Sequence, residues 1–342
     1  MEYLYAFAGI AILVVVFTDL IYTTLSTNGD GFVSGYLSRW LWQAMFFLGG
    51  RRGRSPLMNH AGVTITVFML TVWILLAWIG NGLLFCADPY SVINVQTHLP
   101  ATTGEKFYYA GYTLSTLGMG DFYARTTFWK LLTAAISLSG LTMLTIAITY
   151  LLQVVSSEIA KRQLALYIAS LGGTPHAILL NAWNGRDFKQ LETDTAGLAS
   201  LILSHSQHHL AYPIIHYFHS SRLREASSVN LAALDEALTI LMVSVSESAQ
   251  PSLISLRKAM TTYLLTIEDD FITSSDQSPP LPDMDALRER GVPLVADAGQ
   301  TGKYYDQLSE RRRLLLANVE FGGWTWNDVL RSKFRAELDI ER

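Results

Sequence analysis

Apolar stretches long enough to cross a membrane dominate the first half of the chain. No charged residue occurs from Ala61 to Ala87 or from Leu131 to Ser157, so each stretch is 27 residues long. About 20 residues of helix cross the hydrocarbon core of a bilayer. Another apolar stretch, residues 3–25, is interrupted only by Asp19. The pattern therefore predicts three transmembrane helices.

Charged residues divide the chain into a membrane part and an aqueous part. Residues 1–157 hold thirteen of them, whereas residues 158–342 hold 41. We therefore predict three segments. Residues 1–60 form the first transmembrane helix and an interfacial loop, 61–157 form two further spans with the segment that joins them, and 158–342 form a cytosolic domain.

Basic residues predict the orientation of the spans. Arg39 and three arginines among residues 51–54 follow the first span, and Lys161 and Arg162 follow the last. Basic loops next to the membrane stay in the cytosol. We therefore expect a multi-pass protein of the plasma (inner) membrane, with its N-terminus outside and its C-terminal half in the cytosol. A cleaved signal peptide is disfavoured, because the first span begins with Glu2 and has no basic start.

Two features near the first span have alternative interpretations. Asp19 lies toward the cytosolic end, where we expect it to pair with Arg39 or with an arginine among residues 51–54, since an unpaired charge within a span is costly. The aromatic segment 35–50 suits a helix at the membrane surface and, equally, a short buried helix.

The segment between the second and third spans, "EKFYYAGYTLSTLGMGDFYARTTFW", is too short and too polar to cross the membrane by itself. Non-helical backbone at membrane depth must be buried in protein or line water. We therefore predict a re-entrant design, with a short helix over about 104–115 and an extended strand that returns outward. Gly118 and Gly120 permit positive φ angles, and alternating angles let successive carbonyls point the same way. Such a row replaces the hydration shell of a monovalent cation, with carbonyls from Thr116, Leu117, Gly118, Met119 and Gly120.

"TLSTLGMGD" resembles the potassium channel pore loop, whose core reads Thr-x-Gly-(Tyr/Phe)-Gly-Asp. The resemblance covers roughly residues 61–157 and implies a pore domain made of outer helix, pore loop and inner helix, four copies of which surround one axis as a homotetramer. It also implies that Asp121 lies behind the filter and bonds to the pore helix, where Tyr108 or Tyr112 is the candidate partner. Gly140 stands where the family often keeps a hinge glycine, although close helix packing is an equal interpretation.

Two residues depart from the family pattern. Leu117 replaces the usual Val or Ile, and Met119 replaces the usual Tyr or Phe. Methionine is softer than an aromatic brace, so a weakly selective monovalent cation channel is the alternative to a potassium-selective one.

The cytosolic half is predicted to be helical, over about 187–209, 229–248, 252–271, 303–320 and 325–339, with a Ser/Pro-rich loop at 274–283. The inner helix is expected to continue to Gly172. Five histidines (His205, His208, His209, His216 and His219) cluster here; they suit core packing, proton sensing or a metal site. A net charge of −4 gives no basic footprint for nucleic acid, and the lone Cys86 excludes an intrachain disulfide framework.

The sequence thus predicts an all-α membrane protein with three transmembrane helices, a re-entrant pore helix and filter loop, and a helical cytosolic domain. The expected function is a homotetrameric, potassium-selective channel in the lipid bilayer, gated by its cytosolic domain, which can bind an unknown ligand. No cofactor is expected beyond potassium ions in the filter. We also expect no catalytic activity and no resident metal. A remote alternative is a membrane-anchored, metal-dependent enzyme that uses the histidine cluster.

Overall fold

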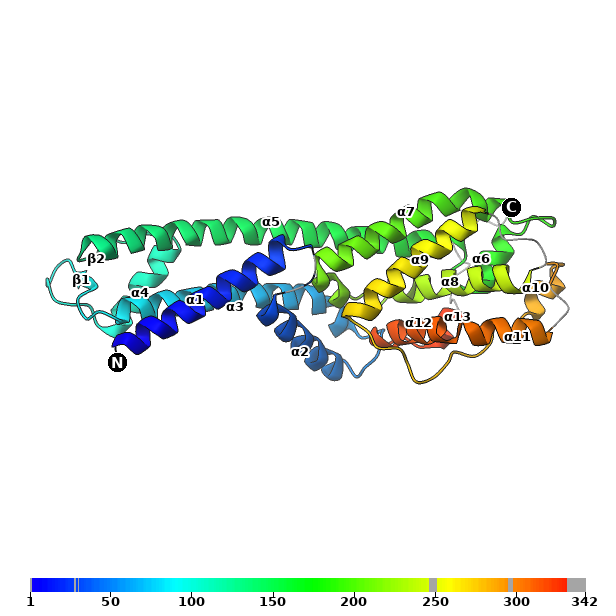
Figure 1. The fold of residues 1–342 in the computed structure, drawn as a ribbon, viewed down its shortest axis with the longest axis horizontal. Helices are drawn as coiled ribbons and strands as arrows, with labels where there is room; N and C mark the ends of the chain where they lie inside the picture. Colours follow the sequence, from blue (N-terminus) through cyan, green and yellow to red (C-terminus); the bar gives the residue numbers. More distant parts are fainter. Residues whose placement is uncertain (1, 28, 30, 246–250, 295–297, 331–342) are drawn as a thin grey trace. The chain divides into compact units, whose positions relative to one another are not determined.

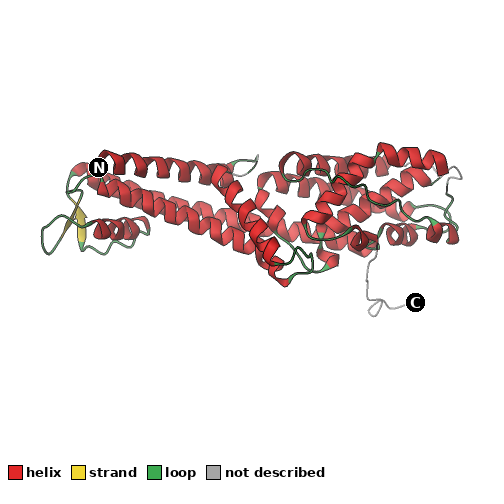
Figure 2. Ribbon diagram, turned by 90° about the horizontal axis from the view of Figure 1, so that it is seen from below, coloured by secondary structure: helices red, strands yellow, loops and turns green. Residues whose placement is uncertain are grey.

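The computed structural model describes residues 2–27, 29, 31–245, 251–294 and 298–330. Within these ranges the chain is mostly helical, with one short sheet of two strands (Figures 1 and 2). The chain forms two compact units. The first unit comprises Met1–Leu41 and Val63–Val155, and the second comprises Trp42–Gly62 and Ser156–Arg342.

The elements up to residue 171 follow the predicted apolar pattern closely. They are α1 (Glu2–Leu25), α2 (Phe32–Leu48), the 3-10 helix η1 (Pro56–His60), α3 (Ala61–Cys86), β1 (Val92–Asn94), α4 (Thr103–Leu114), β2 (Phe122–Ala124) and α5 (Thr127–Leu171). The predicted continuation of the inner helix to Gly172 is confirmed, because α5 is one uninterrupted helix of 45 residues that belongs to both units.

Four helical segments among the described residues are long and apolar enough to cross a membrane. Three of them, α1, Pro56–Cys86 and α5, have only 22%, 33% and 11% of their most apolar window buried within the protein. The fourth, α8 (Ser227–Ser244), is 78% buried, because it lies in the core of the second unit. Its apolar character therefore reflects burial against protein, whereas the other three present apolar side chains outward.

The predicted pairing of Asp19 with an arginine is wrong. The Asp19 carboxylate is buried and accepts hydrogen bonds from the backbone N–H groups of Val33 (2.8 Å) and Ser34 (3.1 Å), from the Ser34 hydroxyl and from the Trp73 indole (2.8 Å). Arg39 instead donates to the carbonyl of Gly35. Asp19 therefore caps the N-terminus of α2, where the helix dipole favours negative charge.

Helix α2 has features of both interpretations of the 35–50 segment. Trp42 and Met45 are buried. Within the second unit the Trp42 ring stacks on the Phe321 ring, with centroids 5.1 Å apart. Trp40 and Phe47 are exposed.

The second unit is a bundle of helices around α8. Its remaining elements are α6 (Pro175–Ala182), α7 (Lys189–Ala211), η2 (Pro213–Tyr217), η3 (Leu223–Glu225), α9 (Pro251–Asp270), α10 (Asp285–Glu289), α11 (Ala298–Gln307), α12 (Ser309–Phe321) and α13 (Trp326–Leu330). The helix predicted at 303–320 is divided between α11 and α12. The one predicted at 325–339 lies outside the described residues beyond Leu330, as do residues 246–248 of the one predicted at 229–248.

Ion pairs hold the core of the second unit together. Asp235 of α8 is fully buried and pairs with Arg257 (2.9 Å) and with Arg311. Glu236 pairs with Arg312 at 2.9 Å, and Arg312 also donates to the carbonyls of Pro279 and Pro280 in the predicted Ser/Pro-rich loop. Each buried carboxylate is thus neutralised. The arginine contacts also fix this non-helical loop to the bundle.

Candidate functional site: the segment after α4

Helix α4 begins at a capping box and ends next to the candidate filter. Thr102 and Glu105 satisfy each other's backbone N–H groups at its N-terminus. At its C-terminus the N–H of Leu117 donates to the Tyr112 carbonyl at 2.8 Å, so the chain leaves the helix through a tight turn. The helix spans Thr103–Leu114, within one residue of the predicted 104–115.

The backbone after this turn alternates between two conformations. Thr116, Gly118 and Gly120 have φ angles of 60°, 59° and 80°, whereas Leu117 and Met119 between them do not have positive φ. Positive φ at every second residue turns successive carbonyls toward one side. Gly118 and Gly120 were expected to have such angles. Thr116 was not, because a side-chained residue resists the left-handed region.

The side chains of this segment lie in the open in the single subunit. Leu117 is 66% exposed and Met119 57% exposed. They therefore gain little packing from their own subunit.

Asp121 lies beside both predicted tyrosine partners. Its carboxylate interacts with the hydroxyl of Tyr108, and its Oδ1 is buried without a hydrogen-bond partner among the described residues. Tyr112 donates instead to the carbonyl of Phe122, at 3.2 Å. The Tyr108 and Tyr112 rings contact each other edge to face, with centroids 5.2 Å apart.

Gly140 allows α5 to approach the end of α4. A Cβ atom at this position would lie 1.9 Å from the Leu114 carbonyl oxygen. The packing interpretation of Gly140 therefore has direct structural support, and its role as a hinge stays a prediction.

The two-stranded sheet next to the candidate filter was not predicted. Strands β1 and β2 pair antiparallel, with Val92 opposite Ala124 and Asn94 opposite Phe122. Thus residues that precede α4 lie beside residues that directly follow Asp121. Strands of three residues are too short to show an alternating pattern, so only the long-range pairing reveals them.

The histidine cluster is packed within the second unit. His205, His209 and His216 are buried, and the nearest ring nitrogens of His209 and His216 are 3.3 Å apart. The His205 ring stacks on Tyr263 and the His216 ring on Phe271. Among the described residues no three His, Cys, Asp or Glu side chains are grouped to hold a metal ion. The packing therefore matches the core interpretation better than the metal interpretation.

Burial makes these imidazoles hard to protonate. Desolvation lowers the pKa values of His205 and His216 well below the usual range and that of His209 to about 3, and the nearby Lys161 ammonium lowers all three further. His219 lies in the same region, donates from Nε2 to the Gly53 carbonyl at 2.6 Å, and also has a lowered pKa because of burial. His208 is less buried, and desolvation lowers its pKa too.

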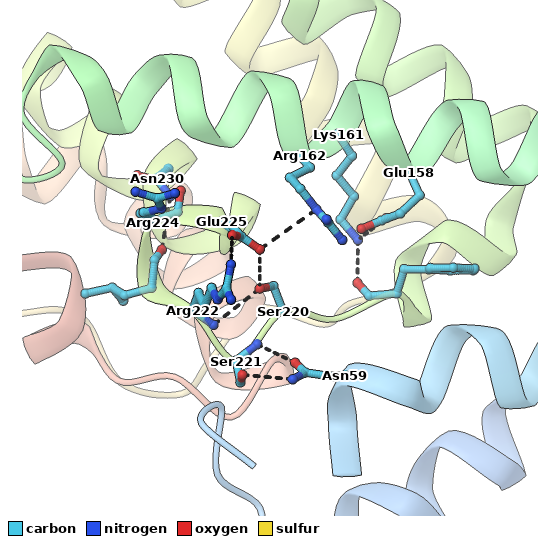
Figure 3. A network of polar contacts seen from close by, with 12 residues as sticks. Asn59, Glu158, Lys161, Arg162, Ser220, Ser221, Arg222, Arg224, Glu225 and Asn230 are labelled. Atoms are coloured by element: carbon cyan, nitrogen blue, oxygen red, sulfur yellow. Dashed lines mark hydrogen bonds and ion pairs between the residues drawn. The ribbon is translucent and has the colours of Figure 1, made fainter. Parts of the chain in front are cut away.

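Polar contacts attach the C-terminal part of α5 to the rest of the second unit (Figure 3). The Lys161 ammonium donates to the carbonyls of Ile215 (2.8 Å) and Phe218 (2.5 Å) and lies 3.4 Å from the Glu158 carboxylate. Arg162 faces Glu225 at 3.9 Å. A cavity of about 50 Å³ between these groups and the histidines has room for a few waters and none for a nucleotide.

Asn59 joins the same network from the other side. Its side-chain oxygen accepts from the Ser221 N–H (2.6 Å), and its amide donates to the Ser221 hydroxyl (2.9 Å). Figure 3 shows this pair next to the Ser220–Glu225 contacts. The segment just before α3 is thus held by the loop that α5 also contacts.

Comparisons with known proteins agree with the fold of residues 61–157. A family model described as "Ion channel" matches residues 63–157, from α3 through the candidate filter into α5. The chain is also 33% identical over 327 residues to "Uncharacterized membrane protein YdjJ" of Bacillus subtilis (strain 168), with 94% of this chain and 95% of that protein covered. No solved structure matches the chain significantly. The resemblance to the potassium channel pore-domain family is thereby confirmed: the chain is a membrane protein of the same family as YdjJ, and its residues 63–157 are an ion channel domain.

Proposed function

We propose that the protein is a homotetrameric potassium channel whose filter is formed by Thr116, Leu117, Gly118, Met119 and Gly120. The observation that carries the proposal is the alternation of positive φ at Thr116, Gly118 and Gly120 directly after a short helix. Four such strands around one axis present rings of carbonyl oxygens that replace the hydration shell of a potassium ion. The negative end of the α4 dipole points toward the entry to this row and favours a cation there.

The topology that we propose has three membrane spans. Helices α1, α3 and α5 cross the bilayer, α4 is re-entrant, and the N-terminus lies outside. Basic residues after α1 and at Lys161–Arg162 support a cytosolic location for the second unit. The membrane is the plasma or inner membrane.

Selectivity for potassium over sodium depends on how firmly the carbonyl rings keep their spacing. Met119 replaces an aromatic brace by a flexible side chain, so a weakly selective monovalent cation channel is the second candidate. A reversal potential measured between potassium and sodium solutions separates the two. A value that follows the potassium gradient supports the first, and a value that follows both ions supports the second.

The continuity of α5 supports the further proposal that the second unit gates the channel. This helix lines the proposed pore and continues as one rigid element into the cytosolic bundle. A ligand that shifts the bundle can therefore move the pore-lining part of α5. The chain has no catalytic role in this proposal. A metal-dependent enzyme remains the remote alternative and would show metal-dependent turnover in the purified full-length protein.

The decisive experiment is recording from purified protein in planar bilayers under a potassium gradient. Gly118→Ala is the test of the filter. A Cβ at Gly118 has open space, but its φ of 59° is unfavourable for alanine by about 1–2 kcal/mol. We therefore expect assembly to persist while the carbonyl row is distorted and the current is lost.

Gly104→Ala is the matched control, because Gly104 also has open space and lies in the first turn of α4 without positive φ. Its current should equal that of the unmodified channel. Full current through tetramers of Gly118→Ala would show that the filter lies elsewhere.

A further inference from the structure

We infer that the two-stranded sheet of β1 and β2 fixes the outer end of the filter, so that the Val95 backbone N–H is a determinant of ion selectivity. This inference rests on the proposed channel function. It assigns a positioning role to residues 91–95, which lie before α4 and contribute no carbonyl to the pore.

The filter continues directly into the sheet. Gly120 is followed by Asp121, whose carbonyl accepts a hydrogen bond from the Val95 N–H at 2.9 Å. Three residue pairs of the sheet follow, and at the far end the Arg125 N–H donates to the Ser91 carbonyl at 3.1 Å. Every residue from Asp121 to Arg125 is thus opposite a residue of the 91–95 segment.

Ser91, the first residue of this segment, and Asp88 just before it together bond to three helices. The Ser91 hydroxyl donates to the Phe85 carbonyl of α3 at 2.6 Å. Just before it, the Asp88 carboxylate accepts from the Trp129 indole of α5 at 2.8 Å, and the Asp88 carbonyl accepts from the Lys106 ammonium of α4 at 2.7 Å. The sheet therefore transmits the rigidity of α3, α4 and α5 to Asp121.

The filter itself has few internal supports. On its inner side the Leu117 N–H donates to the Tyr112 carbonyl at 2.8 Å, and on its outer side the Val95 N–H holds Asp121. Among the described residues, no backbone hydrogen bond involves Gly118, Met119 or Gly120. The subunit thus fastens the carbonyl row at its two ends.

Loss of the outer fastening should act on selectivity before it acts on assembly. The carbonyls of Gly118 and Met119 can then move apart, and a more flexible ring discriminates less between ions of different radius. The exposed Met119 side chain provides no compensating contact within the subunit. The buried side chains of Val92, Phe122 and Ala124 pack in one cluster with residues of α3, α4 and α5. Loss of a single backbone hydrogen bond leaves this packing in place, so we expect assembly to persist.

Val95→Pro tests this inference, because proline removes the N–H that bonds to Asp121. Val95→Ala is the matched control; it shortens the same side chain, which is 40% exposed, and keeps the N–H. The measurement is the potassium-to-sodium permeability ratio from reversal potentials in planar bilayers, with tetramer formation checked by size-exclusion chromatography. We expect Val95→Pro to lower the ratio about fivefold, the equivalent of one net hydrogen bond, and Val95→Ala to leave it unchanged.

A backbone ester in place of the amide at position 95, introduced by semisynthesis, removes the same N–H without the proline ring. It keeps the inference testable if Val95→Pro does not assemble. Equal permeability ratios for the ester and the unmodified channel would overturn the inference while the channel function stands. If the unmodified protein passes no current, or passes potassium and sodium equally, the proposed function or its selectivity fails instead.

Discussion

Gly140 is a residue at which α5 approaches the end of α4 closely. A methyl group there would lie 1.9 Å from the Leu114 carbonyl oxygen, only two residues before Thr116. Gly140→Ala must therefore displace either α5 or the helix end that begins the filter. Overpacking of this kind typically costs about 1–3 kcal/mol. We expect a lower melting temperature of the purified channel together with a large loss of current.

Gly197→Ala is the matched control for this substitution. Gly197 lies within α7 in open space, so alanine should be neutral or stabilising by up to about 1 kcal/mol through helix propensity. If Gly140→Ala conducts and melts like the unmodified protein, α5 does not need the close approach. A hinge at Gly140 would instead change the open probability without a loss of thermal stability.

Individual residues also show where sequence reasoning reaches its limit. Gly118 and Gly120 could be assigned positive φ angles because glycine adopts them without the steric cost that other residues have. Thr116 could not, since its angle follows from the turn that ends α4. The negative charge of Asp19 led to the prediction of an arginine partner. In the structure the chain turns back through Gly31, and the N-terminus of α2 lies against the Asp19 carboxylate. The capped N–H of Val33 is fourteen residues from Asp19, so no local sequence pattern indicates this contact.

At the scale of elements, length decides what could be predicted. The sequence predicted the long apolar helices α1, α3 and α5. It also predicted the short helix α4, which is followed by the glycine-containing segment. The strands β1 and β2 were not, because each has three residues and their pairing depends on residues 28 or more positions apart. The outer support of the candidate site therefore emerges only from the folded chain.

The histidines on α7 and η2 make the stability of the second unit depend on pH. Burial, reinforced by Lys161, lowers the pKa of His209 to about 3, from about 6.5 in an unfolded chain. Below pH 6.5 the unfolded chain thus binds a proton that the folded one does not. Unfolding becomes easier as the pH falls, by up to about 1.4 kcal/mol per pH unit for this residue, until the folded pKa is reached. Above pH 6.5 the effect disappears.

His209→Gln tests this dependence, since glutamine does not titrate. Thermal unfolding of the full-length protein in detergent should become less sensitive to acid below pH 6.5, while His208→Gln, at a less buried position, should change the slope less. Identical pH profiles for the unmodified protein and His209→Gln would show that the imidazole is readily protonated in the folded state. That result would favour the proton-sensing interpretation of the cluster.

At the scale of the whole molecule, α5 is the helix through which we expect a change in the second unit to reach the proposed pore. It passes from the first unit to the second between Val155 and Ser156 and continues to Leu171. In the part of α5 that belongs to the second unit, Lys161 and Arg162 attach the helix to the loop around Ser220. The sequence predicted this continuity from unbroken helical character. The carbonyl partners of Lys161, at Ile215 and Phe218, are 54 and 57 residues away and could not be predicted.

Insertion of two glycines between Val155 and Ser156 tests the transmission through α5. Glycine destabilises a helix by about 1 kcal/mol per residue relative to alanine, so the pair should make a flexible joint. We expect the open probability to change while the potassium-to-sodium permeability ratio stays the same, because the filter and its supports lie within the first unit. The control is an insertion of four alanines, which adds about one helical turn and keeps α5 rigid and nearly in phase. If the two insertions give the same open probability as the unmodified channel, the second unit does not act on the pore through α5.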